Sequence, residues 1–190
     1  MEGEELLIEQ KDKIAFLYIN RPKKFNALNI SLLNKINITL RAISKNDKIR
    51  VIILTGIGEK AFAAGADILE FSEFKSKEAM ELSKNGKEKV FDFIEDFSKP
   101  VIAAINGYAL GGGLELALSC DIRIASDNAL MGFPETSLGT IPGYGGTYRL
   151  AEIVGKGIAK EMILTCRKIS AKEALEMGLI SYLTEKNQLL

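Results

Sequence analysis

The chain has 190 residues, of which 47% are apolar and 26% charged, and this balance predicts one soluble globular domain with a full core. Its 25 basic and 25 acidic residues cancel, and no dense basic block is present, so we do not expect nucleic acid as a primary partner. The even charge also disfavours a membrane-surface role. With no histidine, the chain cannot carry a Ser-His-Asp triad, a Cys-His pair or a histidine-bound zinc.

Targeting signals and redox chemistry give little further direction. No apolar run approaches the length of a membrane span, and no N-terminal apolar stretch follows a basic start, which predicts a cytoplasmic protein. Cys120 and Cys166 lie far apart and outside any C-x-x-C pattern. We therefore expect reduced, packed thiols rather than a disulfide or a metal site.

The first predicted elements are a hairpin and a helix. Apolar residues at 6–9 and 14–20 flank a charged turn, and Arg21-Pro22 ends the second strand. From about residue 31, apolar residues recur at helical spacing as far as Ile43. The polar residues that follow it close this helix.

The remainder of the chain alternates between predicted strands and helices. Short apolar runs predict strands at 51–55, 101–105, 122–125 and 180–183. Residues 56–66 are expected to form a loop, and residues 77–97 have helical patterns. Ser170 to Glu173 is a capping box that opens a helix, and Gly178 should close it. This order predicts an α/β fold layered around mostly parallel strands.

Two glutamates are the strongest candidates for acid and base catalysis. Glu115 stands within residues 114–118, a helical run that is apolar on nearly every side, where an unpaired charge would be costly. Ionisable groups in apolar surroundings cluster at functional sites. Glu135 follows twenty residues later, after Phe133 and Pro134. The alternative for an isolated glutamate is a solvated surface position, but without histidine the acid and base work falls to carboxylates, Lys or Tyr.

A run of three glycines, residues 111–113, opens the helix that carries Glu115. The exposed N–H groups of a helix start carry partial positive charge and would stabilise a developing negative oxygen. Without side chains at Gly111 and Gly112, a flat carbonyl can lie against the backbone. Glycines also occur simply as tight turns, so this motif gains weight from the neighbouring carboxylate.

A dinucleotide-binding motif is the main competing interpretation. Residues 56–61 follow a strand and fit the pattern G-x-G-x-x-A. The next residues do not start an amphipathic helix that could hold a pyrophosphate, and no acidic residue ends a strand about twenty positions later. The sequence therefore disfavours a nucleotide-dependent dehydrogenase.

Three longer motifs resemble the crotonase, or enoyl-CoA hydratase, superfamily. They are AFAAGADI at 61–68, AINGYALGGGLE at 104–115, and the stretch from Pro134-Glu135 to GTIPG at 139–143. Asn20-Arg21-Pro22 and Asn26-Ala27-Leu28 add to the resemblance, which spans nearly the whole chain. It implies an α/β, crotonase-like fold of repeated ββα units.

The resemblance also implies an activity. In this family, two backbone N–H groups hold an acyl-CoA thioester carbonyl, and here they match Ala66 and Gly112. Members that keep both glutamates look like hydratases, which convert a 2-enoyl-CoA to a 3-hydroxyacyl-CoA in fatty-acid or related metabolism. By analogy, Glu115 assists attack of water at Cβ and Glu135 exchanges the proton at Cα. CoA is part of the substrate, so no separate cofactor or metal is expected.

Further substrate contacts follow from the same resemblance. The candidate CoA- or substrate-binding residues are Lys24, Ala63, Ala64, Gly65, Asp67, Ile68, Gly111, Phe133, Leu138 and Gly143. Asp67 is better explained as a helix N-cap than as a ligand. The acyl chain, expected to be short or medium, would meet apolar residues that could equally be core: Leu69, Phe71, Phe133, Leu138, Ile141 and Tyr144.

Length is the largest departure from the family pattern. Family members usually continue further, through helices that close the acyl site and build a trimer, often paired into hexamers. Residues 1–190 are therefore expected to be a single crotonase-core domain that lacks most of those helices. Two alternatives stay open: a 3,2-enoyl-CoA isomerase, which needs one carboxylate and no attacking water, and a non-catalytic crotonase-core unit for binding or assembly.

Overall fold

The computed structural model describes residues 3–70 and 76–190, and within them the strands form two sheets. The first has the order β1-β2-β3-β5-β7-β10. Its strands are β1 (Leu6–Lys11), β2 (Ile14–Ile19), β3 (Val51–Gly56), β5 (Val101–Ile105), β7 (Ile122–Ser126) and β10 (Tyr182–Thr184). The second has the order β4-β6-β8-β9. Its strands are β4 (Ala61–Ala63), β6 (Tyr108–Leu110), β8 (Leu130–Gly132) and β9 (Lys168–Ser170).

A repeated ββα unit relates the two sheets. Each of β3, β5 and β7 is followed by a short strand of the second sheet, namely β4, β6 and β8, and then by a helix. The neighbours β2, β3, β5, β7 and β10 are parallel, as are β4, β6 and β8, because each crossover passes through a helical segment. The predicted α/β fold of repeated ββα units is confirmed.

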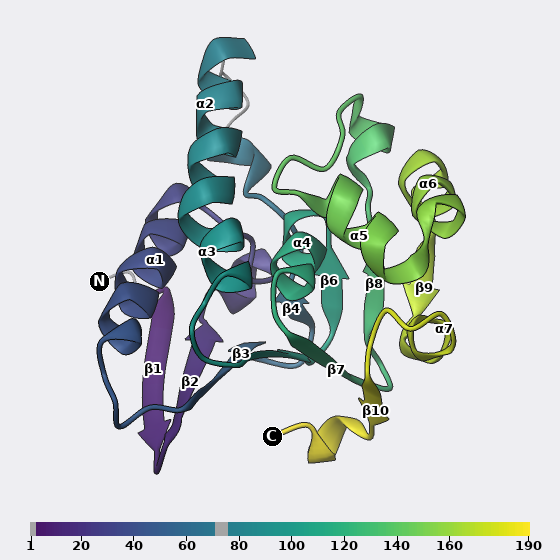
Figure 1. Cartoon of the computed structure of the whole chain (residues 1–190). Helices are drawn as coiled ribbons and strands as arrows, with labels where there is room; N and C mark the ends of the chain where they lie inside the picture. The colour runs from purple at the N-terminus through teal and green to yellow at the C-terminus, as the bar shows by residue number, and fades with distance from the viewer. Residues whose placement is uncertain (1–2, 71–75) are drawn as a thin grey trace.

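The helices of the first half cover one side of the molecule. Helix α1 (Ile30–Ser44) is capped by Asn29, whose side chain accepts a hydrogen bond from the Leu32 N–H. The helix predicted over 77–97 consists of α2 (Ser76–Gly86), a π-helical turn at Lys87–Phe91 and α3 (Asp92–Glu95). Figure 1 shows α2 and α3 as one continuous column.

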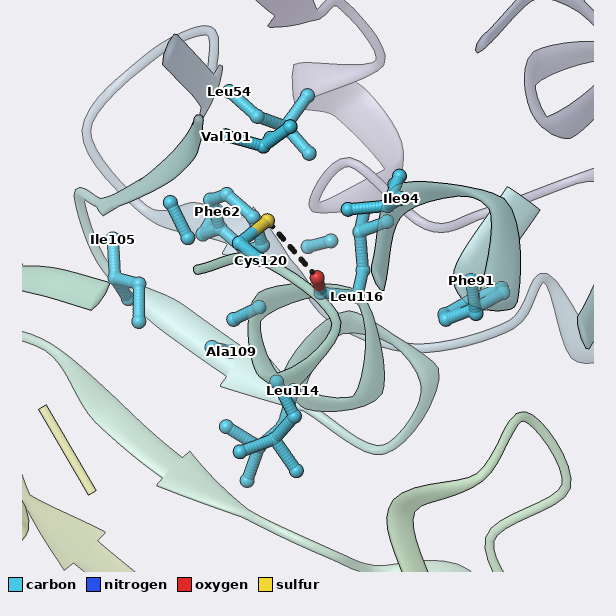
Figure 2. Packing of buried hydrophobic residues seen from close by; sticks show 14 of the residues in the cluster. Leu54, Phe62, Phe91, Ile94, Val101, Ile105, Ala109, Leu114, Leu116 and Cys120 are labelled. Carbon is cyan, nitrogen blue, oxygen red and sulfur yellow. Dashed lines mark hydrogen bonds between the residues drawn. The ribbon is translucent and has the colours of Figure 1, made fainter. Parts of the chain in front are cut away.

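Helix α4 (Gly112–Leu118) lies at the centre of the molecule, and all of its residues are buried (Figure 1). Figure 2 shows Leu114 and Leu116 of this helix among apolar side chains from several other elements. The thiol of Cys120 donates to the Leu116 carbonyl, and burial raises the pKa of this thiol to about 12. Both cysteines are free.

The C-terminal third contains α5 (Gly146–Val154), α6 (Lys156–Thr165) and α7 (Ala171–Glu176). The predicted capping box is confirmed: the Ser170 hydroxyl accepts from the Glu173 N–H, and the Glu173 carboxylate accepts from the Ser170 N–H. Gly178 follows with φ +77°, which favours glycine. In residues 3–70 and 76–190, no helix has the length and apolar character of a membrane span.

The predicted loop over 56–66 is wrong in part, because residues 61–63 form β4. The strand β6 at residues 108–110 and the helices α5 and α6 also had no sequence prediction. A three-residue strand is too short to display an alternating pattern. Strands β4 and β6 form because they pair with each other in parallel, so that each supplies hydrogen-bond partners to the backbone groups of the other.

Close backbone packing fixes α4 against β4. A Cβ added to Gly113 would lie 1.9 Å from the carbonyl oxygen of Ala63, a backbone atom that cannot move aside. We therefore expect Gly113→Ala to lower the free energy of unfolding by about 3 kcal/mol, measured by urea denaturation.

The matched control is Gly157→Ala in α6, where an added Cβ meets nothing within 4 Å. Its free energy of unfolding should stay unchanged or rise by up to about 1 kcal/mol, as alanine favours helix. Equal stability of the Gly113 variant and the wild type would contradict the close approach of α4 to β4.

Candidate active site

The carboxylate of Glu115 is almost completely buried, with 1% of the residue exposed. Its Oε1 atom accepts hydrogen bonds from the N–H groups of Tyr144 and Gly146, both at 2.7 Å. Burial raises the pKa of Glu115 to about 7, an effect opposed by the two N–H donors and reinforced by the charge of Glu135. The predicted placement of Glu115 in apolar surroundings is confirmed.

Glu135 begins the short 3₁₀ helix Glu135–Leu138 after β8 and is partly buried. Its Oε2 atom is buried and has no hydrogen-bond partner within the described part of the chain. Burial raises the pKa of Glu135 to about 7 as well. The charge of Glu135 adds to the rise in the pKa of Glu115, so the two carboxylates lie within electrostatic reach of each other.

Gly111 brings the two carboxylates to the start of α4. Its carbonyl accepts from the Glu115 N–H at 2.9 Å, while a Cβ on Gly111 would lie 2.6 Å from the Glu135 carboxylate. The residue also has φ +51°, a backbone conformation that side chains disfavour. Glycine is therefore required here both for the turn and for the room that Glu135 occupies.

The N–H groups of Ala66 and Gly112 lie next to each other at the same helix start. A Cβ on Gly112 would be 3.5 Å from the Ala66 nitrogen, and one on Gly65 would be 3.9 Å from the Gly112 nitrogen. Neither N–H has an acceptor among the residues that the structure describes. Two such donors side by side can stabilise an oxygen that gains negative charge.

Backbone pairing with Leu28 holds Ala66 in position. The Leu28 N–H donates to the Gly65 carbonyl at 2.8 Å, and the Asp67 N–H donates to the Leu28 carbonyl at 2.9 Å. In this parallel bridge the N–H of Ala66 itself points away from Leu28 and stays available.

An ion pair closes the same loop from the outside. The buried carboxylate of Asp67 accepts from the Arg21 guanidinium at 2.8 Å, and Arg21 also approaches Glu5 at 3.3 Å. Lys24, half exposed, lies 3.9 Å from Asp67 and so reaches the loop predicted to bind substrate. The N-cap role of Asp67 stays a prediction, as does CoA binding by Lys24.

The remaining candidates divide by burial. Phe133 is fully buried, and Tyr144 is 6% exposed and stacked on Phe91 with ring centroids 4.5 Å apart. The side chains of Ile68, Leu138 and Ile141 are exposed. The carbonyl of Gly143 accepts a hydrogen bond from the Ser83 hydroxyl. Residues 63–65 lead directly into the loop that contains Ala66. Phe71 and the side chain of Leu69 lie outside the described residues.

Comparison with protein-family models gives one family, described as enoyl-CoA hydratase/isomerase, whose model matches residues 9–190. The chain belongs to this family. The crotonase-like fold predicted from the sequence motifs is thereby confirmed.

Relatives and solved structures in this family match the chain over nearly its full length. It is 47% identical over 190 residues to the short-chain-enoyl-CoA hydratase of Clostridium acetobutylicum, covering 100% of the chain and 72% of the relative. It is 46% identical to the crotonyl-CoA hydratase of Syntrophomonas wolfei, again over 190 residues and 73% of the relative. An enoyl-CoA hydratase structure from Bacillus anthracis superposes with a TM-score of 0.90 at 42% identity, covering 98% of the chain and 72% of the structure.

Sequence reasoning missed the groups that hold Glu115 and the loop around Ala66 in place. The N–H donors of Tyr144 and Gly146 had no prediction, although Gly143, Gly145 and Gly146 form a glycine-rich run that opens α5, as Gly111–Gly113 opens α4. That likeness is the signal that could have indicated backbone donors. Arg149 carried no signal, and Arg21 appeared only within the Asn20-Arg21-Pro22 motif without a role in the site, since the partners of both are distant in sequence.

The raised pKa of Glu135 predicts a pH-dependent stability. Because the folded state binds protons that the unfolded state has released, stability should fall as pH rises from about 4.5 towards 7. Glu135→Gln removes this buried charge, so its free energy of unfolding at pH 8 should exceed that of the wild type by about 1–2 kcal/mol, allowing for partial exposure.

Urea denaturation of both proteins at pH 5 and pH 8 measures this effect. At pH 5 the difference between them should shrink, because the wild-type carboxyl group is then largely protonated. The same difference at both pH values would show that Glu135 has an ordinary pKa.

Proposed function

We propose that the protein hydrates 2-enoyl-CoA thioesters to 3-hydroxyacyl-CoA. The observation that carries this proposal is the arrangement of Glu115 and Glu135 around Gly111, next to the N–H groups of Ala66 and Gly112, which have no acceptor in residues 3–70 and 76–190. Two carboxylates and a pair of convergent backbone donors are the groups that addition of water to an unsaturated thioester needs. Relatives named short-chain-enoyl-CoA hydratase and crotonyl-CoA hydratase support a short acyl chain.

In this proposal the thioester oxygen accepts from the N–H groups of Ala66 and Gly112. Polarising the carbonyl draws electrons from the double bond, so Cβ becomes electrophilic while negative charge gathers on the oxygen. Backbone donors fixed by neighbouring structure stabilise that charge without reorganising during the reaction. The pairing of Leu28 with the loop at Gly65–Asp67 supports such a fixed geometry.

The two glutamates then divide the transfer of water. The oxygen of water bonds to Cβ as Glu115 takes one of its protons, and Glu135 delivers a proton to Cα. Two N–H donors favour the ionised form of Glu115, whereas no described group donates to Oε2 of Glu135. This asymmetry supports Glu115 as the base and Glu135 as the group that carries the proton at rest.

Crotonyl-CoA is the substrate with which to test the proposal. The purified chain should remove the enoyl-thioester absorbance, and Glu115→Gln and Glu135→Gln should each lower kcat at least about 100-fold. The exposed Glu176 at the end of α7 gives a matched control, because Glu176→Gln changes the same functional group away from the site. A folded wild-type chain without activity on short 2-enoyl-CoA thioesters would contradict the proposal.

A 3-enoyl-CoA substrate separates hydration from isomerisation. A hydratase needs both carboxylates to handle water, whereas an isomerase moves one proton between two carbons and needs one carboxylate. We expect Glu115→Gln to abolish hydration. If Glu115→Gln instead retains most of the wild-type rate of isomerisation of a 3-enoyl-CoA, isomerisation is the principal activity.

A further inference from the structure

Arg149, at the first turn of α5, is a charged residue buried in the core, with 2% of it exposed. Burying a guanidinium is costly unless its donors are paired. On one side, Nε and Nη2 donate to Glu95 at 3.0 and 2.6 Å, and Nη2 also donates to Asp92 at 2.7 Å. On the other side, Nη1 donates to the carbonyl of Tyr144 at 2.7 Å. Arg149 thus connects α3 to the loop that precedes its own helix.

That loop is the one whose N–H groups hold Glu115. The Tyr144 residue donates its N–H to Glu115 and offers its carbonyl to Arg149, while Gly146 donates to the same Glu115 oxygen. Glu115 and Arg149 therefore both bind the loop 144–146: Glu115 accepts from two of its N–H groups, and Arg149 donates to one of its carbonyls. A displacement of the loop would move both donors away from the carboxylate together.

Gly145, between the two Glu115 donors, lies directly against the guanidinium of Arg149. An added Cβ there would lie 2.3 Å from Nη1 of Arg149, and the residue has φ +103°. Any other amino acid would be strained and would collide with the arginine. The backbone conformation alone therefore favours glycine between the two Glu115 donors, and the side chains of Arg149 and Tyr148 leave little room for a larger residue.

We propose that Arg149 is a positioning residue that orients the Glu115 carboxylate through the backbone of residues 144–146. The inference deepens the proposed hydratase function and rests on it for its catalytic consequence. Arg149 itself donates to none of the reacting groups: its partners are Asp92, Glu95 and the Tyr144 carbonyl. Its effect on catalysis would come from holding the Tyr144 and Gly146 N–H groups in position against Glu115, because a small displacement of a catalytic group lowers the reaction rate strongly.

The charges around this assembly define what a pH experiment will report. Asp92 and Glu95 on α3, Lys87 of the π-helical turn and Tyr148 of α5 surround Arg149. Glu115 is faced by Glu135, Tyr144 and Arg149. Loss of the Arg149 charge should therefore raise the pKa of Glu115, because the cation favours the ionised carboxylate.

The kinetic test compares Arg149→Lys and Arg149→Met with the wild type on crotonyl-CoA. Both variants should lower kcat roughly 10- to 100-fold, because lysine cannot reproduce the forked geometry and methionine donates nothing. KM should change little, because the guanidinium donors are taken up by Asp92, Glu95 and the Tyr144 carbonyl. The acidic limb of the kcat profile should move to higher pH, further in the methionine variant than in the lysine variant.

Arg123 of β7 provides the matched control. It also donates to backbone carbonyls, those of Leu179 and Cys120, but it is only partly buried and, among the described residues, makes no hydrogen bond to the loop 144–146. Arg123→Lys should lower stability while keeping the wild-type kcat and acidic limb. If it lowers kcat and moves the limb as far as Arg149→Lys does, the effect is a general loss of stability and the positioning role is wrong.

A titration by NMR tests the same inference without catalysis. In protein labelled with ¹³C at the glutamate carboxyl carbon, the Glu115 signal is assigned by its loss in Glu115→Gln. Its titration midpoint should rise in Arg149→Lys relative to the wild type. An unchanged midpoint together with unchanged kcat in a folded variant overturns the inference. If the wild type has no hydratase activity but the midpoint moves, the proposed function fails and the positioning of Glu115 stands.

Discussion

The burial of the Glu115 carboxylate at the first turn of α4 is the constraint on which the site depends. A carboxylate in an apolar core is unfavourable unless donors accompany it, and here two N–H groups of one loop supply them. The same loop, residues 144–146, is hydrogen-bonded to Arg149, and Arg149 is paired with Asp92 and Glu95 of α3. One buried charge therefore organises elements from three regions of the chain.

Glycine backbones bring the second part of the site to the same place. Gly113 allows α4 to pack directly on β4, and the loop after β4 then carries Ala66 beside Gly112. Gly111 leaves room for Glu135, which arrives from the end of β8. The ββα repeat brings these residues together. Strands β4, β6 and β8 are parallel neighbours in one sheet, so the residues that follow each strand lie at the same edge.

Long apolar runs and local capping patterns were predictable because their causes are local. The strand at 101–105, the helix over most of 30–44 and the Ser170 capping box are formed by residues close in sequence. The glutamates were predictable as site residues because a charge within residues 114–118 conflicts with its surroundings. Short strands such as β4 and β6 were not, because each is defined by its partner rather than by its own pattern.

The sequence by itself determined the fold class, the family motifs and the two candidate carboxylates. Only the tertiary structure decided which backbone groups face Glu115, why Gly145 must be glycine, and that Oε2 of Glu135 has no partner among the described residues. Those features depend on contacts between residues far apart along the chain, such as Arg149 with Asp92 and Glu115 with Gly146. Their energies arise when the elements pack together, so no local pattern of residues encodes them.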